Sequence, residues 1–296
     1  MMDQYERFQG VFALLLTPFQ PNGDIDWQAY DRYVDWQLAG GPHGIFASCG
    51  SSELRHLTLH ERLALTRRAV ERAGQTPVVA VANAESERGS HPEEVKQMLD
   101  MGVSGVVFIP PDGVGHDQKQ LGDYFAELAE ISTVPVVLYE IPSSKPKEIA
   151  PATYGRLVRE TRVCGIKDTS GTLAGTLAKV EQAPQSVVYQ AVAPFLLETI
   201  RAGGRGAMVI VSTASARLVV NLWNQARADD PAAVESQRRL TYLNALFELG
   251  YTATAKYLAS LSGAKMDLYC RTGRTLSTVA AKSIETWYEQ YGSEQT

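Results

Sequence analysis

Residues 163–180 read VCGIKDTSGTLAGTLAKV, and this stretch holds the unit from which we expect the whole fold to be built. It opens on an apolar run of the kind that forms a strand buried on both faces of a parallel sheet. Polar residues and a glycine follow, and Leu173, Leu177 and Val180 then recur at helical spacing. A buried strand, a short loop and an amphipathic helix make one βα unit.

Similar apolar runs recur along the first two-thirds of the chain, with amphipathic segments between them. Together with the first run, they lie at residues 11–16, 44–47, 77–82, 105–109, 135–139, 163–166, 187–189 and 207–211. Their onsets are roughly 20–35 residues apart, which is the spacing of βα units. Eight such units favour closure into a (β/α)8 TIM barrel, since an open doubly wound sheet uses fewer.

Local signals mark the starts of several helices. Asp26 precedes one amphipathic segment, and Thr58 with Glu61 forms a capping box ahead of the next. Ser90 with Glu93 has the same pattern ahead of a third segment. We therefore expect helices to begin just after residues 26, 58 and 90.

The pattern changes after about residue 225, where strand-like runs stop. Helical stretches follow at residues 232–250, 252–261 and 277–291. We expect a barrel domain at residues 1–225 and a C-terminal helical appendix at residues 226–296.

Composition narrows the class of protein and of partner. Of 296 residues, 45% are hydrophobic and 21% charged, as in ordinary globular chains. The net charge of −5 gives no broad basic face for nucleic acid or an anionic membrane. No apolar run reaches the roughly 18 residues of a spanning helix. We expect a cytoplasmic protein with no nucleic-acid or membrane partner, and its three widely spaced cysteines indicate no disulfide framework.

The active site of such a barrel lies at the carboxyl ends of the strands, where Lys167 is the outlier. Burial there lowers the pKa of a lysine, and a neutral amine can attack a ketone to form a Schiff base. The alternative is a lysine that extends to solvent or pairs with Asp168. Tyr139 ends the preceding strand, so its phenol is a candidate for moving protons beside Lys167. A packing role for Tyr139 stays open.

The loop after the second apolar run offers donors for an anion. Gly50, Ser51 and Ser52 combine backbone N–H groups and hydroxyls, which suit a carboxylate or a phosphate. His56 and His60 are spaced as zinc ligands on one helix would be. Because the expected cap lies between these histidines, we expect no shared helix and no metal site.

Several motifs together resemble those of the dihydrodipicolinate synthase / N-acetylneuraminate lyase family. They are GIKDTSG at 165–171, YEIP at 139–142, LTPF at 16–19, CGSSE at 49–53 and GGRG at 203–206. The resemblance runs in order through nearly the whole chain. It implies a homotetrameric barrel, or a dimer, that acts on 2-oxo acids, usually pyruvate, without a metal or an organic cofactor.

The resemblance also implies roles for individual residues. Lys167 would form the Schiff base and Tyr139 would shuttle protons. Gly50, Ser51 and Ser52 would hold the carboxylate of the oxo acid. Thr17 and Met208 would border the same pocket.

The sequence departs from the synthases of this family at four places. The first threonine of the family's loop falls on Gly50, and the tyrosine pair after the fourth strand is replaced by Pro110-Pro111-Asp112. The substrate-binding arginine falls near Ser144, and the acidic pair after the seventh strand is Ala191-Val192-Ala193. We therefore do not expect a true dihydrodipicolinate synthase, nor a polyhydroxylated sugar acid as substrate.

Two further positions stay open. Glu140 stands where the family usually has asparagine, and its side chain should point toward the helix layer, so its role is structural or catalytic. Lys145 or Arg55 is a candidate for meeting a second anionic group of the substrate.

The favoured function is a Schiff-base lyase, an aldolase or dehydratase, with pyruvate as product or donor. The alternative is a catalytically inactive barrel that binds a small 2-oxo acid as a sensor or scaffold. A phosphate-binding isomerase ranks lower, because the glycine-rich turn at residues 203–206 precedes the eighth strand instead of following it.

Overall fold

The computed structural model describes residues 5–114, 117–140 and 148–292. Eight parallel strands close into a barrel in chain order, with β1 paired to both β2 and β8. The strands are β1 Gly10–Leu14, β2 Gly44–Ser48, β3 Val78–Val81, β4 Gly105–Phe108, β5 Val136–Tyr139, β6 Val163–Asp168, β7 Val187–Gln190 and β8 Gly206–Ala207. The predicted TIM barrel is confirmed.

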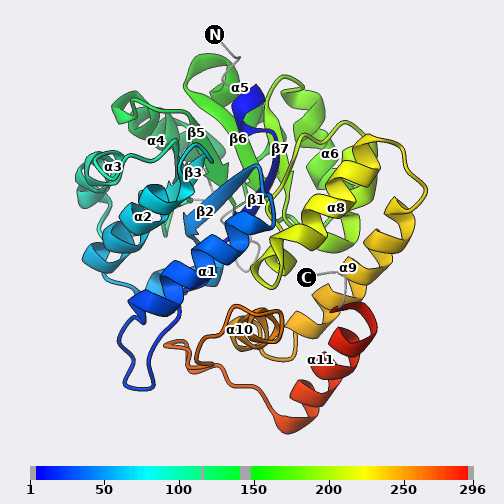
Figure 1. The fold of residues 1–296 in the computed structure, drawn as a ribbon. Coiled ribbons are helices and arrows are strands. Elements are labelled where there is room, and N and C mark those ends of the chain that lie inside the picture. The colour runs from blue at the N-terminus through cyan, green and yellow to red at the C-terminus, as the bar shows by residue number, and fades with distance from the viewer. Residues whose placement is uncertain (1–4, 115–116, 141–147, 293–296) are drawn as a thin grey trace.

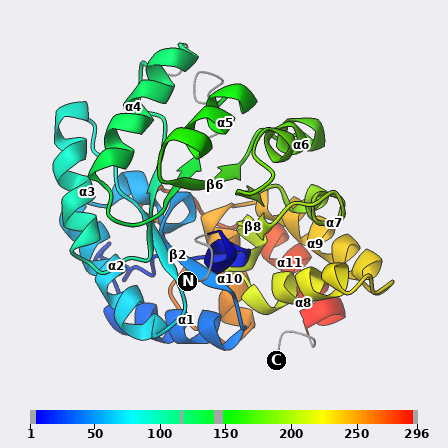
Figure 2. The same cartoon turned by 90° about the horizontal axis from the view of Figure 1, so that it is seen from above.

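Helices surround this barrel, as the view down its axis shows (Figure 2). They are α1 Trp27–Ala39, α2 Leu59–Ala73, α3 His91–Leu99, α4 Gln118–Ile131, α5 Pro151–Glu160, α6 Leu173–Gln182, α7 Leu196–Arg201 and α8 Ala216–Arg227. The appendix follows as α9 Ala233–Phe247, α10 Thr252–Leu261 and α11 Thr278–Tyr291. Short 3-10 turns include η1 Glu6–Phe8, η2 Gly50–Ser52, η3 Leu54–His56 and η7 Ile210–Thr213.

All three predicted helix starts are confirmed, because α1, α2 and α3 begin at Trp27, Leu59 and His91, and two of the three expected caps form. The side chain of Asp26 accepts from the N–H of Ala29, and Thr58 and Glu61 form the reciprocal capping box. The expected cap at Ser90 is wrong. Ser90 already has helical backbone angles, and its hydroxyl donates to the carbonyl of Glu87 instead.

The eighth strand is shorter than predicted. Pairing covers only Gly206 and Ala207, and residues 210–213 turn into η7. The physical reason is a side chain that replaces a strand carbonyl. The hydroxyl oxygen of Ser212 accepts from the N–H of Leu14 at 3.0 Å, so β1 needs no further partner there.

Aromatic side chains fill the amino end of the barrel. Phe12 stacks on Phe8 and meets Tyr189 edge-on, with ring centroids 5.9 and 5.4 Å apart. Glycines make this layer possible. A Cβ on Gly44 would lie 2.3 Å from the ring of Phe12, and one on Gly206 would lie 2.3 Å from that of Tyr189. Space for polar groups is therefore left at the carboxyl end.

The appendix packs on the barrel and reaches its carboxyl end. Side chains from α9, α10 and α11 share one hydrophobic cluster with residues of β1, α1 and α8. Figures 1 and 2 place α10 near the barrel axis, at the end opposite η1. Because η1 leads into β1, α10 lies at the end where the strands terminate.

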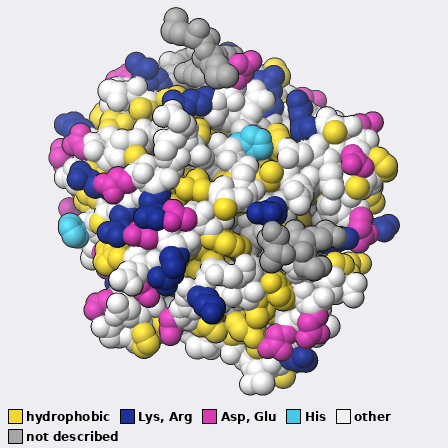
Figure 3. All heavy atoms as spheres, viewed as in Figure 1, with side chains coloured by type: hydrophobic (Ala, Val, Ile, Leu, Met, Phe, Trp, Pro, Cys, Tyr) yellow, Lys and Arg dark blue, Asp and Glu magenta, His cyan; other side chains and the backbone are white. Residues whose placement is uncertain are grey.

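The surface is mixed in character. On the face in Figure 3, acidic and basic side chains are interspersed and hydrophobic ones form small groups. None of the helices among the described residues is long and apolar enough to cross a membrane.

Candidate active site

The barrel register brings Lys167 and Tyr139 together. Tyr139 of β5 pairs directly with Lys167 of β6, so both side chains point to the same side of the sheet. The Nζ atom of Lys167 lies 4.1 Å from the centroid of the Tyr139 ring and 5.5 Å from that of Phe46. Lys167 is only 4% exposed. The amine is therefore enclosed by aromatic faces inside the barrel mouth.

Burial sets the protonation of both groups. It lowers the pKa of Lys167, against the opposing effects of Cys49 and Tyr251. It raises the pKa of Tyr139 well above the ordinary value for a phenol. Burial thus shifts Lys167 toward its neutral form and Tyr139 toward its protonated form.

Neither alternative for Lys167 fits these contacts. The side chain does not extend to solvent, and the carboxylate of Asp168 is bound elsewhere. Lys179 of α6 donates to Asp168 at 2.8 Å, and the N–H of Ser170 donates at 2.9 Å. Among the described residues, no carboxylate forms an ion pair with Lys167.

Glu140 lies on the outer side of the barrel wall, as its place in the strand indicated. Its carboxylate accepts from Lys179 at 2.8 Å and from the N–H of Ile149 at 2.9 Å. Burial raises the pKa of Glu140 to about 7, with Lys179 opposing and Asp168 adding to the rise. Its contacts join β5, β6 and α6, which is a structural role.

The turn η2 approaches the phenol closely. A Cβ on Gly50 would lie 3.3 Å from the hydroxyl oxygen of Tyr139. The hydroxyls of Ser52 and Ser51 donate to the carbonyl of Leu15, at 2.7 and 3.2 Å. Thr17 donates to the carbonyl of Ser52 at 2.8 Å. These three hydroxyls brace the turn, so they are already bound within the protein.

Met208 lies inside the barrel near Tyr139. It is fully buried and belongs to the same cluster inside the barrel as Phe46 and Tyr139. The structure therefore brings Lys167, Tyr139, Gly50 and Met208 into one region.

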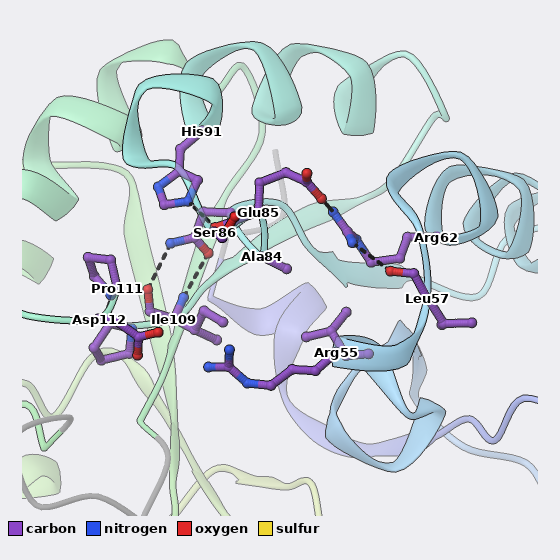
Figure 4. Close-up of a pocket in the computed structure, with 13 residues that line it drawn as sticks. Arg55, Leu57, Arg62, Ala84, Glu85, Ser86, His91, Ile109, Pro111 and Asp112 are labelled. Carbon is purple, nitrogen blue, oxygen red and sulfur yellow. Dashed lines mark hydrogen bonds and ion pairs between the residues drawn. The ribbon is translucent and has the colours of Figure 1, made fainter. Parts of the chain in front are cut away.

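A pocket of about 230 Å³ opens beside this region, between the loops that follow β2, β3 and β4 (Figure 4). Leu54 and Ile109 line the pocket and also pack in the cluster with Tyr139. Arg55 points into the pocket from η3, and Asp112 lines its other side. Pro110 and Pro111, at the place of the family's tyrosine pair, form part of this wall.

Two residues of the appendix, Lys256 and Tyr251, have contacts near this region that the sequence analysis did not predict. Lys256 of α10 donates to the carboxylate of Glu53 at 2.9 Å, and both side chains are fully buried. Tyr251, at the start of α10, interacts electrostatically with Tyr139 and Lys167. No local pattern links residues so distant in the chain, so only the folded structure reveals them.

The remaining candidates are the histidines, the cysteines and the segment that follows Glu140. His56 lies in η3 and His60 in α2, so they do not share a helix, as expected. Within the described ranges, no group of three or more His, Cys, Asp or Glu side chains is placed to hold a metal ion. Cys49, Cys164 and Cys270 are buried free thiols. Ile141, Pro142, Ser144 and Lys145 lie outside the described residues.

Comparison with known proteins gives consistent matches along the chain. The model of the Dihydrodipicolinate synthetase family matches residues 7–283. The 4-hydroxy-tetrahydrodipicolinate synthase of Gluconacetobacter diazotrophicus is 27% identical, over 86% of this chain and 88% of its own. The enzyme of that name from Bacillus subtilis is 26% identical, over 87% of this chain and 90% of its own.

Solved structures share the fold. YagE, a prophage protein of the dihydrodipicolinic acid synthase family from E. coli K12 in complex with pyruvate, has a TM-score of 0.90 at 23% identity. The match covers 96% of this chain and 98% of YagE. A monomeric dihydrodipicolinate synthase variant has a TM-score of 0.91 at 22% identity, covering 99% of each chain. Since the family match spans nearly the whole sequence, this chain belongs to the dihydrodipicolinate synthetase family.

Proposed function

We propose that the chain is a Schiff-base lyase, an aldolase or dehydratase, that acts on a 2-oxo acid with pyruvate as product or donor. The observation that carries the proposal is the buried amine of Lys167, 4.1 Å from the ring of Tyr139 at the carboxyl end of the barrel. The names of the relatives and the pyruvate complex of YagE support it.

The proposed reaction starts with the neutral amine. The lone pair of Lys167 Nζ attacks the keto carbon, and the keto oxygen leaves as water after taking up two protons. In the resulting iminium ion, the bond between C3 and C4 breaks and its electron pair moves to C3. The proton of the C4 hydroxyl is released as C4 becomes an aldehyde. Protonation of C3 and hydrolysis of the imine then free pyruvate and Lys167.

In the dehydratase form of the reaction, C3 loses a proton and the C4 hydroxyl leaves as water. The iminium ion is the electron sink in both cases, so neither form calls for a metal or an organic cofactor.

Tyr139 is proposed to move the protons. With its pKa raised by burial, its phenol is protonated at neutral pH and can donate to the departing keto oxygen. Gly50, Ser51 and Ser52 would hold the oxo-acid carboxylate, with the N–H groups of Gly50 and Ser51 as donors, since both serine hydroxyls donate to Leu15 and the N–H of Ser52 donates to Cys49. Thr17 would brace this turn and Met208 would border the pocket.

A true dihydrodipicolinate synthase remains the less favoured activity. Pro110 and Pro111 stand in place of the tyrosine pair, and Ala191-Val192-Ala193 in place of the acidic pair. We also propose a homotetrameric or dimeric assembly, which rests on family membership alone.

The test is reduction with borohydride in the presence of pyruvate, followed by intact mass and peptide mapping. We expect one stable adduct on Lys167 and none in Lys167→Ala. Lys282→Ala, which removes an exposed lysine, serves as the matched control and should keep the adduct. If neither pyruvate nor any other short 2-oxo acid gives an adduct, the proposal is wrong.

A second candidate is a barrel that binds a 2-oxo acid without turning it over. The proline pair and the alanine-rich segment favour it, because they remove polar groups from the substrate side. A thermal shift with pyruvate, without cleavage or dehydration of any member of a panel of 2-oxo-3-deoxy acids, would favour this sensor or scaffold.

A further inference from the structure

Two side chains of the appendix, Tyr251 and Arg274, have no role in the chemistry proposed above. The guanidinium of Arg274 lies over the ring of Tyr251, 5.4 Å from its centroid. Tyr251 stands at the N-terminal end of α10, which lies at the carboxyl end of the barrel (Figures 1 and 2). The pair therefore comes from a different part of the chain than the catalytic strands but meets the same end of the barrel.

Hydrogen bonds and ion pairs anchor the segments that carry this pair to the loop after β2 and to α2. Lys256, in the second turn of α10, donates to Glu53 at 2.9 Å. The N–H of Thr272 donates to the other oxygen of Glu53, also at 2.9 Å. Arg271 forms a bidentate ion pair with Glu61, at 2.7 and 2.9 Å. Since Glu53 directly follows Ser52, the appendix is fixed against the turn proposed to bind the oxo acid.

The backbone of Tyr251 is strained. Its φ of 48° and ψ of −107° are unfavourable for a residue with a bulky side chain. The conformation is held by hydrogen bonds on both sides, from the N–H of Tyr251 to Phe247 at 2.6 Å and from the N–H of Ala255 to Tyr251 at 3.0 Å. Strain of this kind gathers at functional sites, where surrounding structure maintains it.

The phenol of Tyr251 is coupled electrostatically to groups of the barrel mouth. It interacts electrostatically with Tyr139, Lys167 and Cys49, all in the barrel mouth. Tyr251 is 37% exposed, as expected of a side chain at an open mouth. Burial raises its pKa to about 12, so the phenol is a hydrogen-bond donor at neutral pH.

Arg274 adds an available cation. It is exposed, and within the described part of the chain no carboxylate pairs with it. A guanidinium beside a phenol donor is a suitable receptor for a carboxylate, which accepts from both.

We propose that Tyr251 and Arg274 form a substrate subsite that binds a second carboxylate, at the end of the substrate away from the 2-oxo group. The inference rests on the proposed Schiff-base function and specifies its substrate as a dicarboxylic 2-oxo acid. The appendix is then part of the substrate site, and Tyr251 and Arg274 determine specificity.

The test compares two probes of equal chain length, 2-oxoglutarate and 2-oxopentanoate, which differ in a terminal carboxylate against a methyl group. Both compete for Lys167 in one borohydride reaction, and mass spectrometry gives the ratio of adducts. We expect the wild type to favour 2-oxoglutarate by about tenfold or more, as a charge-assisted contact provides. Arg274→Gln should bring the ratio near one, Tyr251→Phe should lower it severalfold, and Arg274→Lys should restore part of it.

Three controls separate the outcomes. Pyruvate has no second carboxylate, so its adduct should form equally in all variants. Arg227→Gln removes an exposed charge at the end of α8 and should leave the ratio unchanged. Arg55→Gln tests the pocket beside the site.

The inference is overturned by a wild-type ratio near one, by variants at Tyr251 and Arg274 that keep the wild-type ratio, or by a loss confined to Arg55→Gln. It is also overturned if pyruvate is trapped and neither longer acid is. If pyruvate itself is not trapped on Lys167, the proposed function fails as well, which distinguishes the two failures.

Discussion

The burial that lowers the pKa of Lys167 also costs stability. Its pKa in the folded protein lies below the unfolded value, so protonating it in place is unfavourable. That unfavourable contribution is absent above the unfolded pKa and grows as the pH falls toward the folded pKa. The residue proposed for catalysis is therefore one that the fold would be more stable without.

We predict that Lys167→Met raises the free energy of unfolding at pH 7 by about 1 kcal/mol, because an apolar side chain of similar length replaces a buried amine. The gain should shrink as the pH approaches 10.5, the ordinary value for lysine. Urea unfolding of the wild type and the variant at pH 7 and pH 10 measures the gain in the free energy of unfolding at each pH. A loss of stability at pH 7, or a gain that does not change with pH, would contradict the prediction.

The sequence predicted the positions of some site residues but not the hydrogen bonds of others. Lys167 and Tyr139 end adjacent strands, and register alone brings them together. The hydroxyls of Ser51 and Ser52 were expected to be free for a ligand, but the carbonyl of Leu15 accepts from both. Such a competition depends on a neighbouring strand, so no local pattern reports it.

At the scale of elements, the contact between the β2 loop and α10 stands out. Glu53 has a left-handed backbone with φ of 60°, and its carboxylate is enclosed between Lys256 and the N–H of Thr272. A buried charge that loses its partner is strongly destabilising, whereas removing both partners is much less so. The loop proposed to bind the oxo acid is thus held by a helix far along the chain.

We predict that Lys256→Met destabilises the protein by about 3–5 kcal/mol and raises the KM for a 2-oxo acid, because Glu53 loses its partner. The double variant Glu53→Leu/Lys256→Met should recover a large part of the stability. Lys282→Met, which breaks an exposed pair with Glu285, should change stability by no more than about 0.5 kcal/mol. Thermal and urea unfolding, with steady-state kinetics, test all three. Equal effects of the buried and exposed substitutions would refute the argument.

Elements themselves were predicted well where periodicity decides them. Seven strands and the eight helices between and after them follow from alternating apolar runs and helical faces. The shortness of β8 does not follow from periodicity, because the hydroxyl of Ser212 supplies the hydrogen bond that a longer strand would have given. Ser90 failed as a cap for a similar reason, since its hydroxyl found a nearer acceptor in Glu87.

At the scale of the whole molecule, the barrel and the appendix share a core. Leu240 and Phe247 of α9, Leu258 of α10 and Ile284 of α11 pack in the same cluster as Val11 of β1. The division at residue 225 is still a prediction, and this cluster bears on whether the first part can fold alone. Removing the appendix would expose much of one cluster to water.

We predict that a fragment ending at residue 227, after α8, does not fold cooperatively. The full chain should show a single cooperative transition, and the fragment should be aggregated or lack one. Circular dichroism during heating and size-exclusion chromatography of both proteins decide the matter. A monomeric fragment with a sharp transition would show that the barrel is an independent unit.

The 3.3 Å approach between a Cβ at residue 50 and the phenol oxygen of Tyr139 also constrains how this sequence can change over time. Restoring a threonine at Gly50 would press a branched side chain against the group proposed to move protons. Either Tyr139 would shift by a few tenths of an ångström, or the threonine hydroxyl would form a hydrogen bond with the phenol. The glycine therefore sets the room that the phenol has, and any side chain at residue 50 changes it.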